Sequence, residues 1–96
     1  MTSKERAYLR GLANSIDAIF QVGKGGISPA LIKQVDDALE ARELIKITVL
    51  ETAPESVKEI GNVLSEETNS VFVQAVGSKI TLFRQRKEKS RIVFPK

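Results

Sequence analysis

The sequence contains no cysteine and no histidine among its 96 residues. The chain therefore has no disulfide, no thiolate nucleophile and no imidazole base, and any zinc site would have to be built from carboxylates alone. Tryptophan is also absent, and only the single tyrosine and four phenylalanines are aromatic. These absences exclude most enzyme classes, so we expect a non-catalytic protein that needs no metal and no cofactor.

Long apolar runs are missing as well. No run approaches the roughly 20 residues that a membrane-spanning helix needs, and the N-terminus lacks the apolar stretch of a signal peptide. A chain of this length has material for one small core and no second domain. We therefore expect a soluble cytoplasmic protein, monomeric and without a membrane segment.

Charge is unevenly distributed along the chain. Fifteen Lys and Arg against twelve Asp and Glu give a net charge of +3, but residues 1–33 carry +3, residues 34–67 carry −6 and residues 79–96 carry +6. If the fold brings the two basic ends together, they form a surface that attracts a polyanion such as nucleic acid. A solvated tail that aids solubility is the alternative interpretation of the C-terminal run.

Hydrophobic spacing predicts three helices and four strands in the order α-β-α-β-α-β-β. The predicted strands cover residues 18–22, 44–50, 71–76 and 79–84. A capping box at Thr2 and Glu5 begins a helix over residues 3–14, and Ser28 followed by Pro29 begins the second helix. Thr52 with Glu55 begins the third.

Strands that alternate with helices favour parallel neighbours. The last two strands are joined by Gly77-Ser78, a loop typical of a type II′ hairpin, and this hairpin is expected to add one antiparallel edge. The predicted fold class is therefore α/β, with a four-stranded mixed sheet packed against helices.

A glycine loop, Gly23-Lys24-Gly25-Gly26, separates the first predicted strand from the second predicted helix. Unpaired backbone N–H groups and the helix dipole favour an anion there, and Lys24 adds a cation. The loop matches neither a Walker loop nor a dinucleotide-binding fingerprint. It fits the G-x-x-G pattern with which KH domains clamp a nucleic-acid backbone. A tight turn that needs glycine only for its geometry is the alternative.

Three separated segments, residues 19–26, 38–46 and 76–77, resemble in this order the CRM domain, the chloroplast RNA splicing and ribosome maturation family, in its single-domain bacterial YhbY-like form. We accordingly assign residues 1–84 to a CRM-like RNA-binding domain and residues 85–96 to a basic tail. The resemblance implies a fold similar to the C-terminal domain of bacterial translation initiation factor 3. It also implies that the G-x-x-G loop contacts RNA, and that this RNA is 23S ribosomal RNA in precursors of the large subunit.

Charge and spacing add candidate RNA contacts to the four loop residues. Arg6 and Arg10 lie one turn apart on the first predicted helix, and Lys33 lies near the start of the second. The basic residues near the C-terminus are expected to form a second electrostatic arm, although residues 92–94 could pack back onto the domain. The members of this arm are Arg84, Arg86, Lys87, Lys89 and Arg91.

The second predicted helix carries Asp36, Glu40 and Glu43 on one stripe. We interpret the stripe as a solvated acidic face rather than as a metal or acid–base site. This face supports an alternative function, an adaptor that binds ribosomal proteins. A third hypothesis is an enzyme that holds a phosphorylated small molecule in the glycine loop, although no histidine is available to activate a hydroxyl nucleophile.

Overall fold

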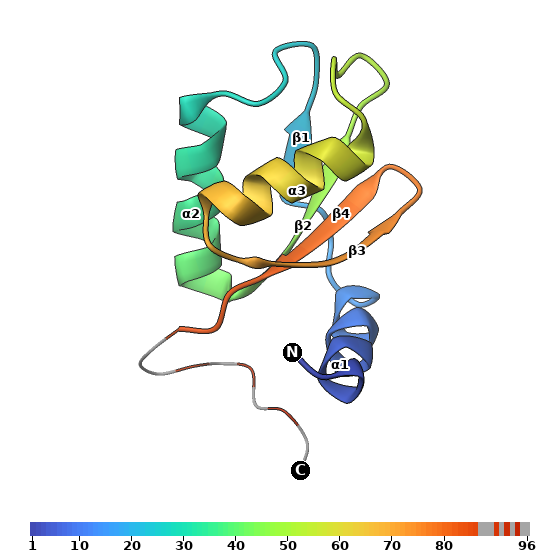
Figure 1. Cartoon of the computed structure of the whole chain (residues 1–96), viewed down its shortest axis with the longest axis vertical. Coiled ribbons are helices and arrows are strands. Elements are labelled where there is room, and N and C mark those ends of the chain that lie inside the picture. The colour runs from blue at the N-terminus through green and yellow to red at the C-terminus, as the bar shows by residue number, and fades with distance from the viewer. Residues whose placement is uncertain (87–89, 91, 93, 95–96) are drawn as a thin grey trace.

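The computed structural model describes residues 1–86, 90, 92 and 94. Its helices and strands follow the predicted order (Figure 1). They are α1 (Ser3–Ala13), β1 (Phe20–Val22), α2 (Pro29–Arg42), β2 (Leu44–Val49), α3 (Val57–Glu67), β3 (Val71–Val76) and β4 (Lys79–Phe83). The predicted α/β class with a four-stranded mixed sheet is confirmed.

The position of the last strand in the sheet differs from the expectation. The strand order is β1-β2-β4-β3, with β1 parallel to β2 and with β4 antiparallel to both of its neighbours. The hairpin therefore does not simply add an edge, because β4 lies between β2 and β3 and leaves β3 outermost. The physical reason is burial: Ile80 to Phe83 are all buried, whereas most of β3 is exposed or half-buried. The central strand is therefore the more deeply buried of the two, although β3 has the more apolar sequence.

The two faces of the sheet are covered to different extents. Helices α2 and α3 pack over one face, where Ile45, Ile47, Ile80 and Leu82 belong to the larger core cluster. On the other face, α1 covers only one end of the sheet, through Leu9 and a smaller cluster (Figure 1). The remainder of that second face has no helix over it. None of the helices in the described part of the chain has the length and apolar character that crossing a bilayer requires.

The first helix begins as predicted. The Thr2 hydroxyl accepts a hydrogen bond from the Glu5 amide at 3.1 Å, and the Thr2 amide donates to the Glu5 carboxylate at 3.0 Å. These hydrogen bonds from Thr2, the backbone one foremost, lower the pKa of Glu5 because they stabilise its charged form. The capping box is confirmed.

The third helix begins later than predicted. Ser56 caps α3 by accepting a hydrogen bond from the Glu59 amide at 3.1 Å. Thr52 cannot form the expected capping box, because Glu55 turns toward the glycine loop and accepts a hydrogen bond from the Ile27 amide instead. Residues 50–55 form the connection after β2, in which the Ala53 amide donates to the Leu50 carbonyl.

The β3–β4 hairpin has the predicted turn and one irregularity. Gly77 has φ of 59°, as the first position of a type II′ turn requires. The pairing shifts between Phe72 and Gln74, so Val73 is the additional residue of a β-bulge. A bulge turns neighbouring side chains to the same side of the strand. Here Val73 packs beneath α1, and Gln74 pairs with Thr81.

Glu43 corrects the prediction of a fully solvated acidic stripe. This residue ends α2 with φ of 67°, and it is 0% exposed. Its carboxylate accepts hydrogen bonds from the Arg86 amide at 2.8 Å, the Ser90 hydroxyl at 2.7 Å and the Ile92 amide at 3.1 Å. The left-handed conformation turns its side chain away from the helical stripe and under the segment that follows β4.

The described residues of the C-terminal segment pack onto the domain, as the sequence allowed. Phe94 lies with its ring 5.7 Å from the Phe83 ring and 5.9 Å from the Tyr8 ring, measured between centroids. Ile92 joins the same cluster under α1. Phe94 and Ile92 therefore pack beside α1, at one end of the molecule (Figure 1).

We predict that Glu43→Gln lowers the free energy of unfolding by about 1–3 kcal/mol, because an amide cannot accept all the hydrogen bonds that converge on the carboxylate. Urea denaturation measures the loss, and the exposed Glu51→Gln is the matched control. The single tyrosine adds a local readout, since Tyr8 fluorescence should change when Phe94 separates from it. Equal stability of the two variants would contradict the role assigned to Glu43.

Candidate nucleic-acid interface

The glycine loop forms a compact turn between β1 and α2. The Gly26 amide donates to the Gly23 carbonyl at 2.9 Å, which leaves Lys24 and Gly25 exposed at the tip. Ser28 then caps α2 by accepting a hydrogen bond from the Leu31 amide at 3.1 Å. The predicted sequence of strand, glycine turn and helix N-terminus is present.

The tip of this turn presents unused hydrogen-bond donors. Among the described residues, the amides of Lys24 and Gly25 find no acceptor, and the Lys24 ammonium forms no ion pair. The positive end of the α2 dipole lies beside them. Backbone donors, a free ammonium and a helix N-terminus together favour an anion such as a phosphate.

The loop after β2 supports the glycine loop from behind. The Leu50 amide donates to the Val22 carbonyl at 2.8 Å, and the Glu55 carboxylate accepts from the Ile27 amide at 3.4 Å. The two loops lie side by side at the end of the molecule opposite α1 (Figure 1). Sequence reasoning missed this use of Glu55, because helix capping explained the same residue equally well.

Two glycines of the turn are under different constraints. Gly26 has φ of 61°, and a Cβ there would lie 2.7 Å from both Glu55 carboxylate oxygens and 2.9 Å from Pro54. At Gly25 a Cβ would meet no atom within 4 Å, and the backbone is not left-handed. The fold therefore requires glycine at position 26 but not at position 25.

We predict that Gly26→Ala destabilises the protein by about 1–3 kcal/mol, since alanine is strained at positive φ and would displace Glu55. Gly25→Ala should leave stability unchanged or raise it by up to about 1 kcal/mol, because it restricts the unfolded chain. Thermal and urea denaturation of the two variants make the comparison. Equal losses would contradict the assignment of the constraint to position 26.

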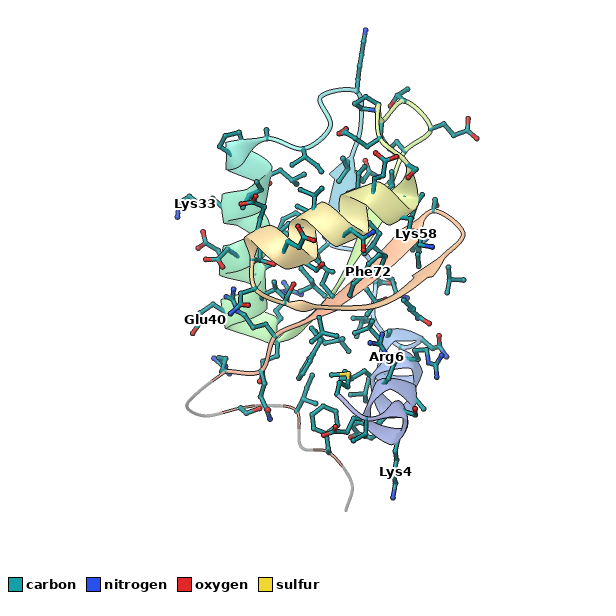
Figure 2. All side chains as sticks on the ribbon, viewed as in Figure 1. Lys4, Arg6, Lys33, Glu40, Lys58 and Phe72 are labelled. Carbon is teal, nitrogen blue, oxygen red and sulfur yellow. The ribbon has the colours of Figure 1, made fainter. Side chains whose placement is uncertain are left out.

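The two arginines of α1 have different environments. The Arg6 guanidinium donates to the carbonyls of Phe72 at 2.9 Å and Val73 at 2.7 Å, and so ties α1 to the bulge in β3 (Figure 2). Arg10, one turn later, is exposed. Both lie far from the glycine loop, because α1 and that loop occupy opposite ends of the molecule (Figure 1).

Arg84 is held by the protein itself. Its guanidinium donates to the carboxylate and carbonyl of Asp36 and to the Thr68 carbonyl, and it lies 3.4 Å from the Glu40 carboxylate. Its side chain is only 22% exposed. These contacts join α2 to the end of α3 and to β4, so Arg84 has a structural role whether or not it also meets RNA.

The other predicted basic residues are placed as follows. Lys33 forms an exposed ion pair with Asp37 at 3.4 Å and points outward from α2 (Figure 2). The Arg86 amide donates to Glu43. Lys87, Lys89 and Arg91 lie outside the described residues. No group of three or more acidic residues in the described part of the chain is arranged to hold a metal ion.

The fold and the site together define a small α/β domain with a mixed sheet and a glycine turn before its second helix. The model of the CRS1/YhbY (CRM) domain matches residues 1–84. The chain therefore belongs to the CRS1/YhbY (CRM) domain family.

Relatives and a solved structure agree with this assignment. The chain is 41% identical to the Bacillus subtilis protein named Probable RNA-binding protein YqeI, over 99% of each chain. It is 28% identical to an RNA-binding protein of Haemophilus influenzae, over 100% of this chain and 96% of that protein. It is also similar to the solution structure of a hypothetical protein from Staphylococcus aureus, with 50% identity, 99% coverage of each chain and a TM-score of 0.82.

Proposed function

We propose that this protein binds RNA without catalysing a reaction, and that the glycine loop Gly23-Lys24-Gly25-Gly26 contacts the RNA backbone. The observation that carries the proposal is the exposed tip of the loop beside the N-terminus of α2. There two amides and the Lys24 ammonium have no partner among the residues that the structure describes. The names of the relatives, which describe RNA-binding proteins, support it. The RNA that we propose is 23S ribosomal RNA in precursors of the large subunit.

The absence of a bulky side chain at Gly25 supports the same proposal. Stability does not call for glycine there, since a Cβ would stand in open space. Close approach of a nucleic-acid backbone to the protein main chain does require glycine, because any side chain would hold the sugar and phosphate away. The open space at Gly25 therefore supports the proposal of a ligand that lies against the turn.

The adaptor hypothesis receives less support. An acidic face that recruits basic ribosomal proteins should carry free carboxylates, yet Glu43 is buried and Arg84 lies against Asp36 and Glu40. Lys33 likewise pairs with Asp37. Much of the negative charge on α2 is thus compensated within the domain, whereas Lys24 forms no ion pair in the described part of the chain.

We predict that Lys24→Ala weakens binding to purified 23S ribosomal RNA. Each neutralised phosphate contributes roughly 0.7–0.9 to the slope of log affinity against log salt concentration, so the slope should fall by up to about one. Filter binding across a salt series measures both quantities. Lys4→Ala, which removes the same charge at the far end of α1, is the control (Figure 2).

Identical affinity and slope for Lys24→Ala and the wild-type protein, with unchanged circular dichroism, would remove the loop from the mechanism. A second measurement separates RNA binding from the adaptor hypothesis. Digestion of the RNA in isolated large-subunit precursors should release the bound protein. Retention on the remaining ribosomal proteins would favour the adaptor.

A further inference from the structure

Part of one sheet face is left open by the fold, and the strand register shows which side chains it carries. Thr48 pairs with Gln21 on β1 and with Lys79 on β4, and Lys79 pairs in turn with Val76 on β3. These four residues form one row across all four strands. A second row is made by Lys46, Thr81 and Gln74.

The next row of the same face is covered. It consists of Leu44, Phe83 and Val71, which pack beneath α1 together with Leu9. Alternation along β2 and β4 makes this row apolar and the two preceding rows polar, while the opposite face remains apolar throughout. Helix α1 therefore ends where the polar rows begin. Its C-cap residue, Asn14, lines a hollow of about 110 Å³ with Lys46, Lys79 and Gln74 among others.

The chemistry of the two open rows is that of a surface for an anion. They contain two lysines, two glutamine amides, the half-buried Thr48 hydroxyl and no carboxylate, while Thr81 is buried beneath them. Within the described part of the chain, neither Lys46 nor Lys79 forms an ion pair. Val76, 62% exposed, is the one apolar member of the two rows. A surface with a single apolar side chain lacks the apolar centre typical of a protein interface.

The spacing of the two lysines suits adjacent phosphates of one strand. Lys46 faces Thr81, and Lys79 lies two residues along the same strand, so the lysines are diagonal neighbours. Such neighbours have Cα atoms about 7–8 Å apart. Their long side chains can therefore reach two successive phosphates without moving the strands.

The open face also connects the two basic regions that the fold separates. Gln21 at one border precedes Gly23 by two residues, about 7 Å along an extended chain. Asn14 at the other border follows the exposed Arg10 by one helical turn. Lys79 and Lys46 thus lie between the glycine loop and Arg10, and the two rows that contain them have no acidic residue.

We infer that the open sheet face is a second RNA-binding surface, on which Lys46 and Lys79 hold the phosphate backbone of the strand that passes the glycine loop. The Thr48, Gln21 and Gln74 side chains donate further hydrogen bonds to phosphate and sugar oxygens. This inference rests on the proposed function, because it extends the contact made by the glycine loop.

The test compares two double variants with the same loss of charge. Lys46→Gln with Lys79→Gln retains the side-chain stems and should lower the salt slope of binding to 23S ribosomal RNA by up to about 1.8, since two phosphates lose their partners. Lys4→Gln with Lys58→Gln is the control. Lys4 lies on α1 away from the open face, and Lys58 lies on α3 on the helical side of the sheet (Figure 2). The salt slope of the Lys4 and Lys58 control variant should stay close to that of the wild-type protein.

The outcomes separate the inference from the proposed function. If Lys24→Ala weakens binding while the two double variants behave alike, the loop functions as proposed and the sheet surface is rejected. If the Lys46 and Lys79 variant alone loses affinity, the sheet surface stands and the role of the loop is rejected. If the wild-type protein binds no ribosomal RNA, both are overturned.

A footprint provides a readout that does not depend on charge. The chain has no cysteine, so one can be introduced at exposed Gln21 in the open rows or at exposed Asn62 on α3 as a control. Saturating 23S ribosomal RNA should slow alkylation of Gln21→Cys severalfold and leave Asn62→Cys unaffected. Equal alkylation of bound and free Gln21→Cys protein would overturn the inference.

Discussion

The pairing of β4 with β2 is the constraint on which the rest of the structure depends. It places Ile45 and Ile47 beside Leu82 and Ile80 on one face, and this apolar surface is what α2 and α3 cover. Covering that face fixes the start of α2 and therefore the glycine loop. On the other face the same register brings Leu44 beside Phe83, where α1 packs, and sets Lys46 and Lys79 on adjacent strands.

Charged side chains then connect elements that the apolar core alone would leave loosely joined. Arg84 links α2, α3 and β4, Arg6 links α1 to the β3 bulge, and Glu43 holds the segment that follows β4. Hydrogen bonds between charged groups and backbone atoms are stronger than neutral ones and require a fixed geometry. The cations engaged in this way stabilise the domain, whereas Lys24, Lys46 and Lys79 are free among the described residues.

Local sequence signals were sufficient to predict the helices and strands, but not all of the contacts between distant residues. The capping box at Thr2, the Ser28 cap and the Gly77 turn each depend on residues within four positions of one another. Glu43 was misplaced because helical spacing was extended through a residue that leaves the helix at positive φ. Arg84 was assigned only to the electrostatic arm, because its acidic partner Asp36 lies 48 residues earlier in the chain.

The sequence by itself determined the class of the domain, the glycine loop before the second helix and the lack of residues for most catalysis, since short-range periodicity and composition carry that information. Only the tertiary structure decided that β4 lies inside the sheet, that Glu43 is buried and that α1 stands at the end opposite the loop. These features depend on pairing between distant segments, which is set by the burial of whole faces. The open face with Lys46 and Lys79 exists only because that pairing aligns two strands.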